Sequence, residues 1–502
     1  MLAWSIYSAF AGMLILMIVP VQGVRWARGV AALSSLAGLG FGLVEAVRFK
    51  ADTGLVTIQK VLWIPSLGIH YHLAYDGVSL VLVLLTGIAA VTGVLFSWNI
   101  ESRPREFFAF YLALIGGVYG VFLSFDLFQL FVFYEIAIIP KYFLIAIWGS
   151  TNREFGAMKL ALYSFVGSAL VLAVIVAAHV VSGGLTFDLT TLVRHSFSAD
   201  FQRWAFPVSF VGFAILAGLW PFHTWAPTGH VAAPTAASML LAGVVMKLGA
   251  YGALRVSMAL FPDGLKFWSW AIGLLSVVGI VYGALVALTQ RDFKFVVGYS
   301  SVSHMGFVLL GLASMNAIGV QGAVLQMFSH GIIAGLLFGV VGRMVYDRTH
   351  TRDLAELQKM GLGHHLPFAA VIFVLAGCAS MGLPGFSGFV AEFQVLIGAW
   401  KAFPWFALLA GFGIVVGAGY TLRAMQMAFF GGKTGNLESP APPEDNPFSH
   451  SLPRITLPEK LGAILLLGLS LVVGLYPKWI LMLIQSGLQS PAFEALRKGV
   501  GW

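Results

Sequence analysis

The chain has 502 residues, of which 59% are hydrophobic and 10% are charged, and its mean hydropathy is +0.89. A soluble protein carries about 25% charged residues, so this composition excludes an ordinary soluble globular protein. The formal net charge of +8 comes from lysines and arginines that stand singly in short loops, a pattern typical of charges that orient a membrane protein and not of nucleic-acid binding.

Apolar segments of about 20 residues follow one another along almost the whole chain, and each can cross a hydrocarbon core about 30 Å thick. The first segment leads directly into a second, so we expect a transmembrane helix there and not a cleaved signal peptide. With both termini outside, the inside loops hold a modest excess of lysine and arginine. We predict one all-α membrane protein of about 14 transmembrane helices, near residues 2–21, 29–47, 77–98, 106–124, 126–149, 159–182, 204–221, 234–258, 268–289, 295–313, 317–342, 366–400, 404–430 and 461–486.

Two segments break the succession of apolar spans. Residues 48–75 have short alternating apolar runs and a proline, Pro65, which predicts an outside β-hairpin. Residues 431–457 are rich in Pro, Gly and Ser without periodicity, which predicts a solvated inside loop.

Two of the predicted spans are interrupted in the same way, by GLWPF at residues 218–222 and by GLPGF at residues 382–386. Proline removes a backbone donor and clashes with the preceding turn, so each motif breaks a helix at membrane depth. Paired broken helices in corresponding positions point to a transporter built from repeats, and ordinary proline kinks are the alternative. His223 and His230 flank the first break, where we expect them to stabilise the bend. The residues assigned to the breaks are Pro221, His223, Pro227, Pro384 and Gly385.

Several ionisable residues fall inside predicted spans, where an ionised group is costly and by default indicates an ion pathway. Desolvation and nearby charge move the proton affinity of carboxylates and amines, and histidine titrates near neutrality, so these types together can form a proton relay. The relay is predicted to comprise, in chain order, Glu135, Lys247, His304, His330 and Glu392.

Each of these residues also has a structural interpretation. Lys247 can be a structural ion-pair partner, Glu135 can bond a neighbouring backbone, and both relay histidines can be satisfied core residues. Lys141, six residues after Glu135, can extend toward the inside surface. Asp76 and Asp126 stand near span starts, where helix capping is expected.

Resident cofactors and metals have little support in the sequence. The single cysteine, Cys378, excludes an internal disulfide and an iron–sulfur cluster held by four thiolates. Bis-histidine haem ligation does not require a mid-span lysine or two broken helices, and Walker-type and HExxH motifs are missing. We therefore expect no metal or cofactor in this chain and any redox centre in a partner.

Four runs carry a strong family resemblance: FYEIAIIPKYFLIAIWG, PFHTWAPTGHVAAPTAASMLLAGVVMKLGAYG, YSSVSHMGFVLLG and GLPGFSGFVAEF. Over about residues 70–430 the chain resembles the antiporter-like subunits of NADH:quinone oxidoreductase, respiratory complex I, and among them the M type. The resemblance implies 14 transmembrane helices with two inverted five-helix repeats, each containing a broken helix. It divides the chain into N-terminal helices with the hairpin (1–105), a first repeat (106–258), a second repeat (259–430) and an inside loop with the last helix (431–502).

The resemblance also assigns roles to single residues. Glu135 matches the family's glutamate of the fifth helix, Lys247 its central lysine, and His304 and His330 its connecting histidines. Glu392 matches the outlet glutamate, where related subunits usually carry lysine, and this favours the M type. The family lysine before the first break is replaced by Leu216.

A second departure accompanies the first. The aspartate of the family's D-A-H motif is replaced by Thr228, whereas Lys141 stands where the family usually has an uncharged residue. One hypothesis is that Lys141 substitutes as the charge partner of Glu135. Six residues leave the two side chains roughly 120° apart on an unbroken helix, although Pro140 between them can bend it. The other hypothesis is a modified or uncoupled channel.

The expected function is therefore proton translocation in the membrane arm of a respiratory NADH:quinone oxidoreductase, coupled to quinone reduction in partner subunits. Those partners would carry FMN and iron–sulfur clusters and bind quinone, and this chain would be a multi-pass protein of a bacterial plasma membrane. The alternatives are an ion-translocating subunit of a related complex (hydrogenase-linked, sodium/proton antiporter or inorganic-carbon uptake) and a structural copy with a modified channel.

Overall fold

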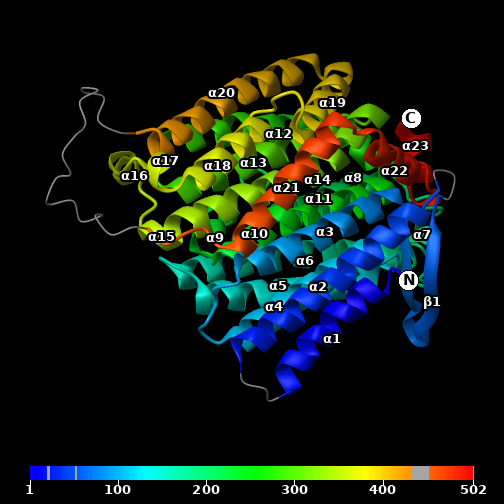
Figure 1. Ribbon diagram of the computed structural model, residues 1–502. Coiled ribbons are helices and arrows are strands. Elements are labelled where there is room, and N and C mark those ends of the chain that lie inside the picture. Colours follow the sequence, from blue (N-terminus) through cyan, green and yellow to red (C-terminus); the bar gives the residue numbers. More distant parts are fainter. Residues whose placement is uncertain (20–22, 51–53, 432–451, 501–502) are drawn as a thin grey trace, which may run out of the picture.

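The computed structural model describes residues 1–19, 23–50, 54–431 and 452–500. Long helices lie side by side through the molecule (Figure 1). Within the described residues, 11 helices are long and apolar enough to cross a membrane. They are α2 (Val24–Arg48), α3 (Gly77–Phe96), α4 (Pro104–Leu123), α5 (Leu127–Trp148), α6 (Arg153–Val181), the continuous segment Thr235–Met258, α12 (Pro262–Thr289), α13 (Phe293–Ala313), the continuous segment Ala317–Thr349, α20 (Pro404–Phe429) and α21 (Leu457–Leu475).

The bundle has two distinct ends. One, the hairpin end, carries both termini, the strands β1 (Val56–Ile64) and β2 (Ile69–Tyr75), and the short helices α7 (Leu189–Leu192), α22 (Lys478–Leu488) and α23 (Glu494–Val500) (Figure 1). The other, the α16 end, carries α15 (Asp347–Thr349), α16 (Leu354–Met360) and α17 (Leu362–His365).

The β-hairpin predicted within residues 48–75 is present. Its strands pair antiparallel, with Val56 opposite Tyr75 and Ile64 opposite Ile69. A short turn that begins at Pro65 joins them, and Gly68 follows with φ of +65°. The predicted loop 431–457 falls mainly on residues 432–451, which lie outside the described residues.

The last predicted span, 461–486, is wrong in its extent. Helix α21 begins at Leu457 and ends at Leu475, and a separate helix, α22, begins at Lys478. Pro477 explains the interruption, because it has no N–H to continue the α21 hydrogen bonds and its ring clashes with the preceding turn.

Both predicted helix breaks are present. Helix α8 (Ala199–Ala217) is followed by α9 (Trp225–Ala232), and α18 (Pro367–Ser380) by α19 (Ser387–Ala402). Gly218 ends α8 with φ of +84°, and Gly382 follows α18 with φ of +72°. These backbone angles favour glycine, so each glycine allows the chain to leave its helix in the middle of the bundle.

Aspartates cap the helices in a matched arrangement at the two ends. At the hairpin end Asp126 caps α5, and its backbone pairs with that of Asp188, the cap of α7. At the α16 end Asp292 caps α13, and its backbone pairs with that of Asp353, the cap of α16. The predicted capping role of Asp126 is therefore confirmed.

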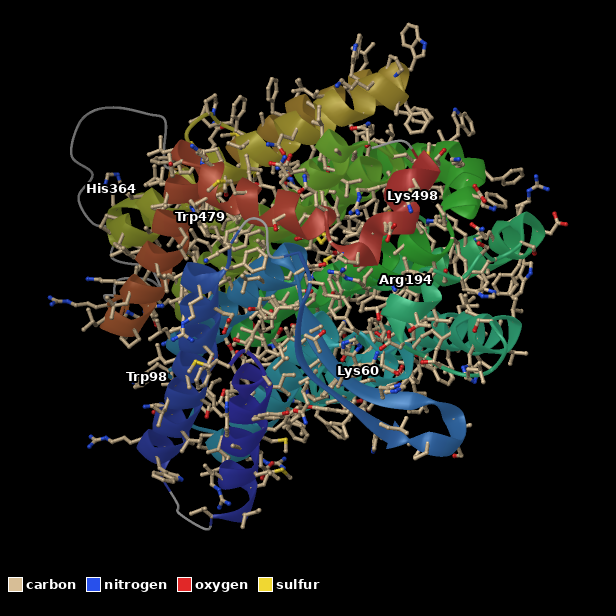
Figure 2. The ribbon with its side chains drawn as sticks, turned by 90° about the vertical axis from the view of Figure 1, so that its right-hand side faces the viewer. Lys60, Trp98, Arg194, His364, Trp479 and Lys498 are labelled. Carbon is tan, nitrogen blue, oxygen red and sulfur yellow. The ribbon has the colours of Figure 1, made fainter. Side chains whose placement is uncertain are left out.

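The hairpin is fastened to the bundle by a buried carboxylate. Asp188 is 1% exposed, and its Oδ2 lies 2.7 Å from both the Lys60 ammonium and the Nδ1 of His72 on the hairpin. Lys60 is visible on the hairpin in Figure 2, which looks onto this end. Burial alone would raise the pKa of Asp188, but the donors His72, Lys60 and Thr190 hold it well below its usual range.

Acid is therefore expected to release the hairpin. Because the folded pKa of Asp188 is depressed, the carboxylate stabilises the hairpin fully above its unfolded pKa of about 3.9, and this contribution is lost as the pH falls toward the folded pKa.

At neutral pH, Asp188→Asn is expected to speed amide hydrogen exchange over residues 56–75 on the order of tenfold, since charged hydrogen bonds contribute about 1.5–3 kcal/mol. Unchanged exchange in Asp188→Asn, with Asp200→Asn as the exposed control, would contradict this.

Candidate functional site

Lys247 lies in a distorted helix at the centre of the bundle. Its segment runs from α10 (Thr235–Leu240) through a π-helical turn, η2 (Leu241–Val245), into α11 (Met246–Gly252) and a second π-helical turn, η3 (Ala253–Met258). Such turns are uncommon and are often found at functional sites. Lys247 is fully buried, and its Nζ donates to the carbonyl oxygen of Ala242 and lies 2.7 Å from Nδ1 of His330.

Two histidines continue the polar line away from Lys247. His330 lies on α14 (Ala317–Phe338), which continues through the π-helical segment η4 (Gly339–Tyr346). The His330 ring faces that of His304 on α13, with 5.5 Å between the ring centroids. His304 then contacts Glu392, with 2.9 Å between Nδ1 and Oε1. The structure thus brings Lys247, His330, His304 and Glu392 together, although they come from four separate segments.

Three polar residues around Glu392 were missed by sequence reasoning. Ser380, the last residue of α18, lies 3.0 Å from Nε2 of His304, and Gln326 donates to Oε1 of Glu392 at 3.1 Å. Tyr420 on α20 interacts with Glu392 and Ser380. The second helix break explains this gathering, because it ends α18 at Ser380 and starts α19 just before Glu392. Single polar residues in apolar spans are common, so no pattern singles these three out.

Glu135 and Lys141 lie on α5, apart from the chain that begins at Lys247. Glu135 interacts with the Ser168 hydroxyl and with the Lys141 ammonium. Within the described part of the chain, neither side chain is hydrogen-bonded to Lys247 or His330. The structure therefore brings together four of the five predicted relay residues and leaves Glu135 in a separate group.

The two histidines near the first break contribute packing. The His223 ring lies edge-on to Tyr282 at 5.3 Å. His230 is fully buried, and neither of its ring nitrogens has a hydrogen-bond partner among the described residues; its ring packs 5.0 Å from Phe338. The charges of Lys247 and Lys294 both act on His230.

The prolines and the glycine predicted at the two helix breaks lie where the backbone leaves or begins a helix. Pro221 follows Trp220 through a cis peptide bond, and Pro227 lies in the first turn of α9, where its missing N–H costs no helical hydrogen bond. Pro384 and Gly385 lie between α18 and α19, and Gly385 has φ of +102°.

Lys294 lies in the first turn of α13, yet it is buried. It is 2% exposed and its Nζ donates to the carbonyl oxygen of Ala233, at the end of α9. It borders a cavity of about 330 Å³ at the α16 end, whose lining also includes Arg343, Asp347 and His350. A lysine next to a helix start looks like a topological charge, and only the packing of α13 against α9 buries it.

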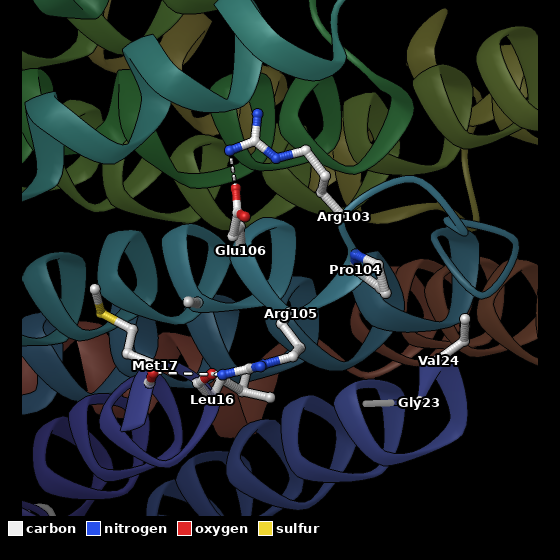
Figure 3. Close-up of a pocket in the computed structure, with 9 residues that line it drawn as sticks. Leu16, Met17, Gly23, Val24, Arg103, Pro104, Arg105 and Glu106 are labelled. Carbon is white, nitrogen blue, oxygen red and sulfur yellow. Dashed lines mark hydrogen bonds and ion pairs between the residues drawn. The ribbon is translucent and has the colours of Figure 1, made fainter. Parts of the chain in front are cut away.

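A larger cavity, of about 530 Å³, lies between the ends of α1 (Trp4–Ile18), α2 and α4. Figure 3 shows Arg105 reaching the backbone of Leu16 and Met17, and Arg103 turned toward Glu106. The two arginines in its lining already have partners, and none of the predicted relay residues lines this cavity. Among the described residues, no group of three His, Cys, Asp or Glu side chains could hold a metal ion.

Both the sequence that contains these buried polar residues and its fold are similar to those of known proteins. The family model described as NADH:quinone oxidoreductase/Mrp antiporter, transmembrane, matches residues 124–417. The chain belongs to this family. The matched residues include Glu135, Lys247, both relay histidines and Glu392.

Members of the family with curated names are similar over most of their length. NADH-quinone oxidoreductase subunit M of Rhodobacter capsulatus is 40% identical over 394 residues, which cover 76% of each chain. NADH-quinone oxidoreductase subunit M of Pseudomonas aeruginosa is 41% identical over 387 residues, 75% of each chain.

Solved structures of family members share the fold. A chain of respiratory complex I from Thermus thermophilus with bound NADH matches with a TM-score of 0.87 and 28% identity over 100% of both chains. A chain of the Mrp complex from Dietzia sp. matches with a TM-score of 0.81, 21% identity and 99% coverage of both, which shows a common fold. This protein is therefore a helical membrane protein of a family whose members form parts of oxidoreductase complexes.

Proposed function

We propose that this chain translocates protons in the membrane arm of a bacterial NADH:quinone oxidoreductase of the M type. The observation that carries the proposal is the buried line of protonatable groups, Lys247 to His330 to His304 to Glu392, in which the first and last steps are contacts of 2.7 and 2.9 Å. Ionisable groups are costly inside a membrane, so a continuous line of them favours a transport role over a structural one.

The groups in this line can hand a proton from one to the next. An imidazole accepts a proton at one nitrogen and releases one at the other, so His304 can pass a proton between the Ser380 hydroxyl at its Nε2 and Glu392 at its Nδ1, beside the His330 ring. The unpartnered Nε2 of His330 is buried and free to take part in the step between the two rings. Glu135 would bind the proton at an earlier step of the same relay.

The redox chemistry in this proposal belongs to partner subunits. They would carry FMN and iron–sulfur clusters and reduce quinone, and other antiporter-like subunits of the membrane arm would flank this chain. The names of the bacterial relatives support this assignment. The chain would lie in the bacterial plasma membrane as a multi-pass protein, with no metal or cofactor of its own.

We also propose 14 membrane spans arranged as two inverted repeats, over residues 106–258 and 259–430. The span count adds α1 and the two broken pairs, α8 with α9 and α18 with α19, to the 11 long helices. Two observations support the opposite orientation of the two repeats. The matched pairs of aspartate caps lie at opposite ends of the bundle, and a glycine follows the first helix of each broken pair.

Replacement of the central lysine tests the proposed function. We expect Lys247→Ala to reduce NADH-driven proton uptake into inverted membrane vesicles by about tenfold or more, since a positioned proton-transfer group contributes about 10²–10⁴ in rate. Quenching of a pH-sensitive acridine dye measures the uptake, and a native gel checks assembly. Lys266→Ala, at an exposed position, is the matched control. Normal uptake by an assembled Lys247→Ala complex would instead support a structural copy with a modified channel.

A second candidate is an ion-translocating subunit of a related assembly. The fold likeness to the Mrp chain and to a chain of the membrane-bound sulfane sulfur reductase, with a TM-score of 0.85 and 22% identity, favours keeping this candidate. Purification of the tagged chain in mild detergent, followed by mass spectrometry, separates the two. Flavin and iron–sulfur subunits with quinone-site chains support the first proposal, whereas small antiporter subunits, a hydrogenase or a carbonic-anhydrase-like partner support the second.

A further inference from the structure

Helix α5 carries two opposite charges, of which Lys141 is fully buried and Glu135 is partly exposed. Lys141 is fully buried, and within the part of the chain that the structure describes its Nζ has no hydrogen-bond partner. The expectation that it extends to the inside surface is therefore wrong. The charge that acts on it is that of Glu135, whose Oε1 is also buried and finds no hydrogen-bond partner among the described residues.

The two charged groups are close enough to interact but are not in contact. Each acts on the charge of the other, yet their atoms do not come within the 4.0 Å of an ion pair. Six residues of α-helix advance the chain by about 9 Å and turn it by about 600°, which accounts for the separation. Cα–Cβ bonds in a helix tilt toward its N-terminus, so the Lys141 side chain starts out in the direction of Glu135.

Pro140 provides an acceptor between the two charges. It lies inside α5 and has no N–H, so the carbonyl oxygen of Ile136 loses its usual helical donor. This oxygen lies one residue beyond Glu135 and within the interval that separates it from Lys141. An ammonium that moves along α5 toward Glu135 can therefore donate to this carbonyl oxygen on the way.

The neighbouring helix α8 supplies an apolar side chain at the same depth. Tyr134 on α5 packs edge-on against Phe213 on α8, with 5.9 Å between the ring centroids. Both helices run from the hairpin end toward the middle of the bundle, so Leu216, three residues after Phe213, lies level with the interval between Glu135 and Lys141. Leu216 is 2% exposed.

We infer that Lys141 is the positive partner of Glu135 and positions its proton, and that the pair opens by movement of one side chain along α5. Because both charges belong to one helix, no displacement of α5 relative to α8 is needed to separate them. The inference rests on the proposed proton-translocating function and assigns Lys141 as a positioning residue within it.

The test compares a loss with a designed recovery in the assembled complex. Lys141→Met is expected to reduce proton uptake about tenfold and to leave Glu135 protonated, which adds a carboxylic-acid band to the infrared spectrum. That band should be missing in Lys141→Met with Glu135→Gln. The double variant Lys141→Met with Leu216→Lys returns an ammonium at the same depth and is expected to restore at least half of the uptake and remove the band.

The outcomes separate this inference from the proposed function. Normal uptake by Lys141→Met overturns the inference while leaving Lys247→Ala to test the relay independently. A loss of uptake in Lys141→Met without the new band, and without recovery by Leu216→Lys, overturns it as well, because a merely structural role predicts that result. Normal uptake by Lys247→Ala overturns the proposed function whatever the Lys141 variants do.

Discussion

Replacement of Arg255 by leucine is expected to lower the free energy of unfolding by about 3–5 kcal/mol, because it leaves a buried carboxylate without its cation. The Arg255 guanidinium and the Asp76 carboxylate are both fully buried, and they form two hydrogen bonds of 2.6 and 2.8 Å. Asp76 also caps α3 through the N–H of Ser79 and accepts from the Ser490 hydroxyl. The pair thus joins η3, α3 and the C-terminal segment.

The midpoint of thermal unfolding in detergent measures this effect. Arg255→Lys keeps the charge but loses the bidentate geometry, so an intermediate loss is expected. Arg255→Leu combined with Asp76→Asn should recover part of the loss, since an amide is less costly to bury alone than a carboxylate. An unfolding midpoint in Arg255→Leu equal to that of the natural chain would show that the ion pair contributes no net stability.

Replacement of Glu392 by glutamine is expected to reduce proton uptake by about tenfold or more while the complex still assembles. Glutamine keeps the shape of the side chain and can still bond His304 and Gln326, so the packing of α19 against α13 and α14 should survive. It cannot take up or release a proton, and Glu392 is the last group of the buried line. Dye quenching in inverted vesicles measures the uptake.

Two companion variants make the Glu392 result specific. Glu392→Asp keeps an ionisable group within reach of His304 and is expected to retain part of the uptake. Glu494→Gln, at a partly exposed position near the C-terminus, is expected to pump normally. Normal uptake by Glu392→Gln would remove Glu392 from the relay and leave His304 as a satisfied core histidine.

Much of the fold could be predicted because the membrane restricts it to apolar helices. Hydropathy located the long helices, alternation located the hairpin, and the Gly and Pro motifs located both helix breaks. The extent of the last span was wrong because the apolar pattern continues across Pro477, whereas the helix does not. Composition cannot report such a turn when both sides of it are equally apolar.

The relay candidates stood out in the sequence because charges inside apolar spans are costly and therefore rare. Their order in space was beyond sequence reasoning, because hydropathy does not mark which helix faces meet. Lys294 and Arg255 illustrate the same limit, because hydropathy does not show which charged residues become buried by packing. Both stand near the ends of predicted spans in the sequence, yet both are buried.

The sequence by itself determined that this is a helical membrane protein with two broken helices and a few ionisable residues at membrane depth. The reason is that the period of apolar residues and the backbone limits of glycine and proline are local properties. Only the tertiary structure decided that Lys247, His330, His304 and Glu392 form one line, that Glu135 stands apart from it, and that Lys141 is buried on the same helix as Glu135. Those relations depend on how distant segments pack, and all of the packing surfaces are similarly apolar.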